Sequence, residues 1–252
     1  MDRATFQLDQ KDAVEWLRGL PSESLDLLVT DPPYESLEKH RAIGTTTRLK
    51  QSAGSSNPWF GVFANARFAE LFVEVYRVLK RHTHFYLLCD AETSFIAKPI
   101  AEQAGFKFWK PLVWDKQSIG MGYHYRSRYE FILFFEKGKR RLNNLGTADV
   151  LQVPRVRNGY PAEKPVALLE TLIGQSTKAG DIVADPFMGS GSAGVASLNL
   201  GRRFLGNDIA NNALVLTRQR LLAQGGQEGI VATDTRPRQS EMALAIARTG
   251  TA

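Results

Sequence analysis

The sequence contains little cysteine and no long apolar run. Its 252 residues include one cysteine, Cys89, and four histidines. A single cysteine excludes an intramolecular disulfide framework, and with so few histidines we expect no dedicated Cys/His metal site. No apolar run approaches the roughly 18 residues that a membrane-spanning helix needs, and the opening MDRATFQLDQKD lacks the apolar region of a secretion signal. We therefore expect a globular protein in the cytoplasm, with no membrane partner.

The sequence also lacks a strong charge of either sign and a phosphate-binding lysine motif. Lysine and arginine number 32 against 26 aspartate and glutamate, which gives a net charge of +6. This modest excess permits a polyanionic partner without requiring one. No glycine-rich loop ends in a Walker lysine, so the sequence does not support the cradling of a nucleoside triphosphate.

Apolar segments of two kinds alternate along the chain. Short continuous runs predict strands over 25–30, 84–89, 106–114, 129–136, 181–185 and 202–207, and segments with a 3.6-residue period predict helices over 67–80, 91–104, 164–177, 191–200 and 210–223. This alternation is typical of an α/β fold with a doubly wound, mostly parallel sheet. We predict that 129–136 is one antiparallel strand at the sheet edge.

Three segments fit no regular element. Residues 35–66 read as a long loop, residues 137–160 as an irregular insertion, and residues 225–252 as a poorly packed tail with a short helix over EMALAIA. In the first loop, Trp59 and Phe60 could contact a ligand or pack against the fold, and the sequence leaves both open.

The stretch TDPPY, residues 30 to 34, ends an apolar strand abruptly. Proline cannot extend a sheet ladder, so the strand must end at Asp31. Pro32 and Pro33 fix the backbone and leave a stiff turn that presents a carboxylate, carbonyls and the ring of Tyr34. Such a corner is flat-faced and rich in acceptors, although taken alone it could be an ordinary turn.

A second corner, DPFMGSG, follows the strand that ends in Asp185. Phe187 lies two residues after Asp185, and Gly189 and Gly191 lead into a predicted helix. Asp208 comes directly after the next predicted strand. In doubly wound folds such glycines let the backbone approach a nucleotide-like ligand, and the later acid takes ribose hydroxyls. The spacing is not the dinucleotide pattern G-x-G-x-x-G.

Together the two corners resemble those of the amino-methyltransferases that use S-adenosylmethionine to methylate an exocyclic amine of a DNA base. The resemblance runs from about residue 5 to 224, through KDAVEWLRGLPSESLDLLVTDPPY, VWDKQSIGMGYHYRSRYEFILFFEKG and EKPVALLETLI. The catalytic block precedes the cofactor block, as in the β group of these enzymes. The resemblance implies a seven-stranded, circularly permuted Rossmann-like sheet and a catalytic domain over residues 1–224.

The resemblance also implies roles for the residues at both corners. Asp31 and the carbonyl of Pro32 would accept the amine hydrogens, the two prolines, Pro32 and Pro33, would hold these acceptors rigid, and Tyr34 would stack on a base flipped out of the duplex. S-adenosylmethionine would be bound by Asp185, Phe187, Gly189 and Gly191 around it, Asp208 at the ribose, Asp12 at the adenine amine, and Lys164 and Pro165 near the methionine end.

DNA is the expected partner, in the cytoplasm or nucleoid of a prokaryote or phage-infected cell. The predicted phosphate contacts are Lys137, Lys139, Arg140, Arg141, Arg155 and Arg157, in the region where this family inserts its target-recognition segment. Arg126 and Arg128 could reach phosphate or pair with Glu130, and both remain open. Members of the β group are often dimers, which makes a homodimer possible here.

Asp31 favours adenine N6 as the acceptor, because the family's cytosine-N4 enzymes more often carry serine at that position. Cytosine-N4 methylation remains the first alternative. An RNA or a protein glutamine acceptor is less favoured, since the glutamine enzymes typically present asparagine there. Cytosine-C5 methylation needs a thiolate, and Cys89 lies within an apolar strand. A catalytically silent nucleic-acid-binding module is the alternative from another class, and the intact corner motifs argue against it.

Overall fold

A computed structural model describes residues 4–36, 61–120, 124–157, 160 and 162–233. The expectations for Trp59, Phe60 and a helix over 241–247 lie outside these residues. Within the described part of the chain, no helix has the length and apolar character needed to cross a bilayer.

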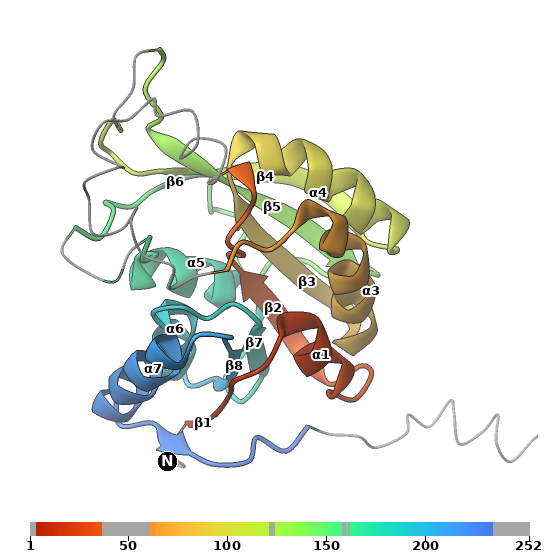
Figure 1. Ribbon diagram of the computed structural model, residues 1–252, viewed down its shortest axis with the longest axis vertical. Coiled ribbons are helices and arrows are strands. Elements are labelled where there is room, and N and C mark those ends of the chain that lie inside the picture. The colour runs from red at the N-terminus through yellow and green to blue at the C-terminus, as the bar shows by residue number, and fades with distance from the viewer. Residues whose placement is uncertain (1–3, 37–60, 121–123, 158–159, 161, 234–252) are drawn as a thin grey trace, which may run out of the picture.

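The described chain is built on one sheet of nine strands (Figure 1). The strands are β1 (Thr5–Asp9), β2 (Leu25–Thr30), β3 (Leu79–Cys89), β4 (Lys107–Asp115), β5 (Tyr129–Lys137), β6 (Val150–Gln152), β7 (Ile182–Asp185), β8 (Arg203–Asn207) and β9 (Gln227–Glu228). Their spatial order is β6-β4-β5-β3-β2-β7-β8-β1-β9. Strand β5 runs antiparallel to both neighbours, β3 and β4, and the other described pairs are parallel.

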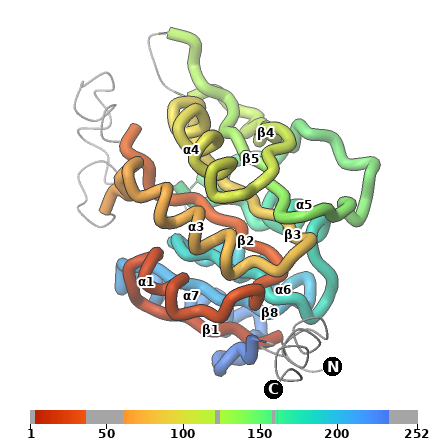
Figure 2. The backbone as a smooth tube through the Cα atoms, turned by 90° about the vertical axis from the view of Figure 1, so that its right-hand side faces the viewer, coloured from red at the N-terminus to blue at the C-terminus, as the bar shows by residue number. Residues whose placement is uncertain are grey.

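Helices cover both faces of this sheet. Helices α1 (Ala13–Arg18), α3 (Phe68–Val78) and α4 (Ala91–Gln103) lie on the face seen in Figure 2, and α5 (Val166–Ser176), α6 (Ser192–Asn199) and α7 (Asn211–Ala223) lie on the other. Strand β2 explains the arrangement, because Leu28 faces the first helix layer while Leu27 and Val29 face the second. An uninterrupted apolar strand is therefore buried on both sides, as a parallel strand should be.

The structure confirms the α/β doubly wound class and corrects two details. The sheet has nine strands rather than seven, because β6 and β9 add three and two residues at its edges. The antiparallel strand is present at 129–137, but it is interior rather than an edge strand. It pairs with β3 on one side and with β4 on the other, and β4, which is more exposed, lies nearer the edge.

The described part of the tail is packed rather than loose. Strand β9 pairs with β1, and Val231 is buried in the core. The folded unit therefore continues beyond residue 224 to at least Val231.

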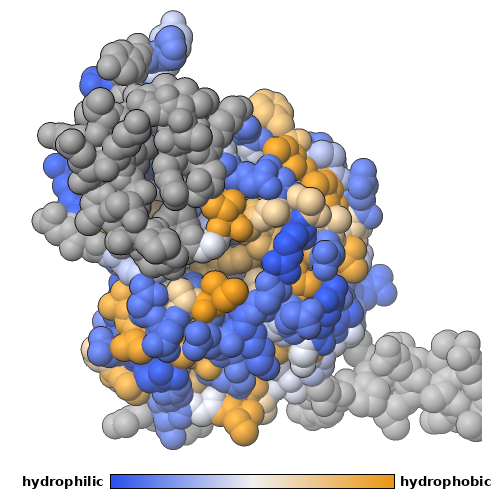
Figure 3. Space-filling view, in the orientation of Figure 1, coloured by the Kyte–Doolittle hydropathy of each residue, from blue (hydrophilic) through white to orange (hydrophobic). Residues whose placement is uncertain are grey.

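The sheet order brings the two corners together. Strands β2 and β7 are parallel neighbours, with Leu27 opposite Val183 and Leu28 opposite Ala184. Carboxyl ends of parallel strands meet at one edge of a sheet, which is where open α/β folds bind ligands. Figure 3 shows a hollow in the middle of the front face, between the α3 side and the α7 side, at the level of this edge.

Candidate active site

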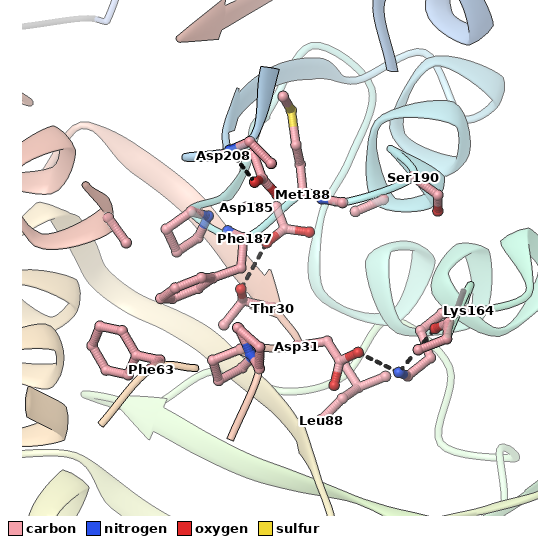
Figure 4. A pocket seen from close by; sticks show the side chains of 18 of the residues that line it. Thr30, Asp31, Phe63, Leu88, Lys164, Asp185, Phe187, Met188, Ser190 and Asp208 are labelled. Atoms are coloured by element: carbon pink, nitrogen blue, oxygen red, sulfur yellow. Dashed lines mark hydrogen bonds and ion pairs between the residues drawn. The ribbon is translucent and has the colours of Figure 1, made fainter. Parts of the chain in front are cut away.

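A pocket of about 350 Å³ lies at the carboxyl edge of β2 and β7. Most of the predicted site residues line it: Asp12, Asp31, Pro32, Pro33, Tyr34, Lys164, Asp185, Phe187, Gly189 and Asp208. Pro165 and Gly191 are not among the lining residues. Residues without a predicted role also line it, among them Phe63, Leu88, Glu130 and Tyr160. The pocket thus joins the two corners that the sequence singled out (Figure 4).

A buried hydrogen bond connects the two corners. The Thr30 hydroxyl donates to Oδ1 of Asp185 over 2.7 Å, and the Phe187 amide donates to the same oxygen over 3.0 Å. Burial raises the pKa of Asp185 to about 7, although both hydrogen bonds oppose this shift. Near neutral pH this carboxyl group can therefore gain or lose a proton in response to a charged ligand.

Asp208 organises the loop after β7. Its Oδ2 accepts from the Gly189 amide and its Oδ1 from the Ala210 amide, each over 2.9 Å. Gly189 and Gly191 both adopt positive φ, at +48° and +76°, which a side chain would disfavour. The carboxylate thus fixes a loop whose backbone requires glycine, while remaining on the pocket wall.

Gly191 serves helix packing rather than the pocket lining. A Cβ there would lie 2.6 Å from the side chain of Thr217 on α7. The Thr217 hydroxyl in turn donates to the Gly189 carbonyl over 3.0 Å. The glycine is therefore needed to let the loop approach α7.

Asn207 was not identified from the sequence, although it connects two loops at this edge. This buried side chain accepts from the Lys11 amide and donates to the carbonyls of Lys11 and Pro186 over 3.0 to 3.2 Å. The only sequence signal was an amide residue at the end of an apolar strand.

Asp31 lies in a line of alternating charges. Its Oδ2 accepts a hydrogen bond from Nζ of Lys164, which is 3.5 Å from Oε2 of Glu130. Glu130 is paired through Oε1 with Lys116 over 2.6 Å. The other Asp31 oxygen, Oδ1, is buried and has no hydrogen-bond partner among the described residues.

The charges in this line set one another's ionisation. Burial raises the pKa of Asp31 above its usual value, and Lys164 opposes the shift. Burial alone would lower the pKa of Lys164, but Asp31 and Glu130 raise it. Burial alone would also raise the pKa of Glu130, but the two lysines hold it below its usual value. Lys164 is therefore a cation between two carboxylates.

Aromatic rings form the wall beside the first corner. Tyr34 is buried and lines the pocket. The Phe63 amide donates to the Pro33 carbonyl over 2.6 Å, and its ring meets Phe187 edge-on with 5.0 Å between centroids. Phe63 lies in the segment that the sequence indicated only as a loop, so its contribution could not be assigned from pattern alone.

Asp12 borders the pocket with both oxygens already hydrogen-bonded. It caps α1 through the amides of Val14 and Glu15, and Arg67 donates to both oxygens over 2.8 Å. The hydrogen bonds from Arg67 lower the pKa of Asp12. A contact between this carboxylate and a cofactor adenine stays a prediction.

The six predicted phosphate contacts do not form one surface. Strand β5 runs away from the pocket, so Lys137, Lys139, Arg140 and Arg141 follow its distal end, whereas Arg155 and Arg157 follow β6 at the pocket end. The Lys137 side chain is buried and donates to the carbonyls of Tyr76 and Leu79. Lys137 is therefore part of the fold rather than an exposed cation.

The hairpin between β4 and β5 projects beyond the pocket edge. It carries the exposed residues Tyr125, Arg126 and Arg128. Arg128 pairs with Asp115 over 2.7 and 2.8 Å, so the pairing with Glu130 that the sequence left open is not formed.

Cys89 lies at the end of β3 and is fully buried. Burial raises the pKa of its thiol, and the nearby Asp90 and Asp31 add to the shift. The side chain is a thiol rather than a thiolate, which is consistent with the expectation that it is no nucleophile.

Comparison with known proteins identifies the family. The N6/N4 methyltransferase family, described as DNA methylase, matches residues 25–156 and 146–219. DNA adenine methyltransferase YhdJ of Escherichia coli K12 is 30% identical over 251 residues, covering 83% of this chain and 80% of that protein. Type II methyltransferase M.HpaI of Haemophilus parainfluenzae is 28% identical over 238 residues, covering 83% and 72%.

A solved structure supports the same fold. The PvuII DNA methyltransferase, which is cytosine-N4-specific, superposes with a TM-score of 0.68 over 98% of this chain and 93% of its own, at 16% identity. The segments that match the family include both corners and every strand from β2 to β8. The chain belongs to the N6/N4 DNA methyltransferase family.

Proposed function

We propose that this protein transfers a methyl group from S-adenosylmethionine to the exocyclic N6 amine of an adenine flipped out of DNA. The observation that carries the proposal is the Thr30–Asp185 hydrogen bond, which joins an acceptor corner and a nucleotide-type corner in one pocket. The base assignment rests on Asp31, because cytosine-N4 enzymes of this family more often carry serine at that position.

The residues of the second corner fit this cofactor. S-adenosylmethionine supplies an electrophilic methyl group on a sulfonium cation and carries an adenosine and an ammonium group. Asp185 and Asp208 offer negative charge and acceptor oxygens on the pocket wall, and Phe187 offers an aromatic face beside them. The positive φ of Gly189 brings backbone close to the pocket without a side chain in the way.

The first corner would position the acceptor nitrogen. An exocyclic amine is a weak nucleophile because its lone pair is delocalised into the ring. Asp31 Oδ1 and the Pro32 carbonyl would each accept one amine hydrogen, which directs the lone pair towards the methyl group. Bound S-adenosylmethionine would supply the methyl group and keep the electron pair of the broken carbon–sulfur bond on sulfur. The proton that the amine nitrogen then loses would leave through its hydrogen-bond acceptor Asp31 to solvent. Fixed acceptors of this kind lower the activation barrier of such a step by roughly several kcal/mol.

The DNA would lie across the pocket end of the sheet. A base in a duplex cannot reach this pocket, so it must leave the stack at a cost of a few kcal/mol, offset by roughly 1 to 3 kcal/mol if it stacks on Tyr34. Arg155, Arg157 and Arg126 are exposed near this edge, and they are suited to phosphate contacts. Lys139 and Arg141 lie at the opposite end of the sheet and are less suited to that role.

The proposal is tested by incubating the purified protein with methyl-labelled S-adenosylmethionine and unmethylated bacterial DNA. Digestion to nucleosides and mass spectrometry then identify the product. N6-methyladenine is the expected result. N4-methylcytosine would keep the mechanism and overturn the base assignment, and cofactor binding without labelled DNA would point to an RNA or protein acceptor. The absence of both binding and transfer would favour a silent nucleic-acid-binding module.

Asp31→Ala provides the matched inactive variant. It should abolish transfer while leaving the cofactor dissociation constant within about tenfold, since Asp31 acts on the acceptor rather than the cofactor. Turnover that survived this substitution would mean that another group accepts the amine hydrogens.

A further inference from the structure

Lys164 lines the pocket and contacts the acceptor corner. Its side chain is 9% exposed, and its ammonium group has three acceptors around it: Asp31 Oδ2, the Ala162 carbonyl at 3.3 Å and Glu130 Oε2 at 3.5 Å. An ammonium group has three hydrogens and accepts none. Asp31 and the Ala162 carbonyl accept hydrogen bonds from this group, and Glu130 forms an ion pair with it, so the ammonium group is held by the protein beside Asp31.

Glu130 lines the same pocket and pairs with the lysine. It lies on β5, two strands away from Asp31 in the sheet, and its second oxygen is paired with Lys116 at the base of the β4–β5 hairpin. The order Lys116, Glu130, Lys164, Asp31 places each charge between charges of opposite sign, except at the two ends. Because its other contacts restrain Lys164, rotation of the Asp31 side chain would break the hydrogen bond between them. Lys164 therefore fixes the orientation of the carboxylate.

We propose that Lys164, held by Glu130, is a positioning residue that binds Asp31 through Oδ2 and leaves Oδ1 as the acceptor for the target amine. This inference rests on the proposed function. It explains why one oxygen of a side chain that is only 25% exposed is buried without a hydrogen-bond partner among the described residues. It also reassigns Lys164, which the sequence placed near the cofactor.

The charge on Asp31 depends on the groups around it. The ionisable groups close to it are Lys164, Glu130, Lys116, Asp185, Tyr34 and Cys89. Among these, Lys164 and Lys116 favour the carboxylate, and Glu130 opposes it. Loss of Lys164 would leave two carboxyl groups near one another without the cation between them, and Asp31 would take up a proton closer to neutral pH. A protonated Asp31 is a poor acceptor.

The test compares single-turnover rates against pH for the wild-type protein, Lys164→Met and Lys164→Arg, with saturating cofactor and DNA. In Lys164→Met the acid limb of the profile should move up by about 1 to 3 pH units, as expected for the loss of one opposite charge at close range. The rate should recover at high pH, whereas a misfolded protein would not recover. Lys164→Arg should keep the acid limb near that of the wild type.

Glu130→Gln provides a variant with the opposite sign. It removes a neighbouring negative charge and keeps the shape of the side chain, so the acid limb should move down. Lys110→Met is the control, because Lys110 pairs with Asp149 at the surface, where both side chains are more than half exposed. That variant should leave both the rate and its pH dependence unchanged.

The cofactor dissociation constant separates the two roles considered for Lys164. It should change less than about threefold in Lys164→Met, since the proposed contact is to Asp31. An unshifted acid limb together with cofactor binding weakened more than tenfold would return Lys164 to the cofactor and overturn the inference while the methyltransferase function stood. A wild-type protein that methylates no DNA would overturn both.

Discussion

Thr30 at the end of β2 and Asp185 at the end of β7 are joined by a buried hydrogen bond of 2.7 Å, 155 positions apart in the chain. Thr30 precedes the acceptor corner directly, and Asp185 begins the cofactor corner. The bond therefore links the two corners directly, within a pocket where the proposed reaction must align two ligands.

Thr30→Val should show how much this connection contributes. Valine keeps the shape of threonine but removes the donor, so Asp185 loses a hydrogen bond in a buried site. The free energy of unfolding at pH 8 should fall by about 1.5 to 3 kcal/mol, the range for a hydrogen bond to a charged group. Thr171→Val, which removes an exposed hydrogen bond from the Thr171 hydroxyl to the Ala167 carbonyl within α5, is the control and should cost much less. Equal losses in urea unfolding would mean that the buried bond has no special weight.

Asp185 should make cofactor binding depend on pH. The pKa of its carboxyl group is raised to about 7 by burial, and a cationic ligand binds the carboxylate in preference to the neutral acid. Affinity should therefore be constant above about pH 8 and fall as pH drops through 7, by about tenfold between pH 8 and 6. Burial also raises the pKa of Asp208, which adds a change of the same sign.

Calorimetric titration of wild-type protein and Asp185→Asn measures this dependence. The substitution should weaken binding at pH 8 and flatten the profile through pH 7. A profile that kept its slope in Asp185→Asn would assign the titration to the ligand's own amine or to another carboxylate. In Thr30→Val the midpoint should move above 7, because the lost hydrogen bond is one that lowers the pKa of Asp185.

The corners themselves could be predicted from sequence because each is local. Two prolines after an apolar strand, or glycines after another, constrain the backbone wherever the strand lies in the sheet. Asp31, Asp185 and Asp208 all line one pocket, and the roles expected for them stay predictions. Their partners could not be predicted in the same way, since the contact of Lys164 with Asp31 depends on which strands are neighbours.

The errors have the same physical origin. The strand predicted over 129–136 is interior because β4 pairs with its outer side, and the order of strands in a sheet depends on contacts between segments distant in the sequence. The basic residues from 137 to 157 are close in sequence, but an antiparallel strand carries the first of them to the far end of the sheet. Residues that are close in the sequence are therefore far apart in the structure.

Asp208→Ala should weaken cofactor binding by about 1 to 3 kcal/mol, the range for a charge-assisted hydrogen bond. The substitution also removes the acceptors of the Gly189 and Ala210 amides, so affinity alone cannot separate a ribose contact from a loosened loop. A cofactor product analogue that lacks the ribose 2′-hydroxyl makes the distinction. Its loss of affinity relative to the parent compound should be large in the wild type and small in Asp208→Ala. Equal losses in both proteins would place the ribose elsewhere.

The split of the basic segment predicts a difference between two pairs of exposed residues. Arg155 and Arg157 follow β6 at the pocket end, whereas Lys139 and Arg141 follow β5 at the distal end. Each phosphate contact releases counterions, so replacing Arg155 and Arg157 together by alanine should reduce the slope of log affinity against log salt by about 2, roughly one for each contact. The same change at Lys139 and Arg141 removes an equal charge and should leave the slope unchanged. Fluorescence anisotropy with a labelled duplex measures the slopes of both variants. The salt concentration runs from about 50 to 200 mM, a range over which such slopes are resolved. The reverse result would place DNA at the distal end of the sheet, away from Asp31, and would contradict the proposed docking.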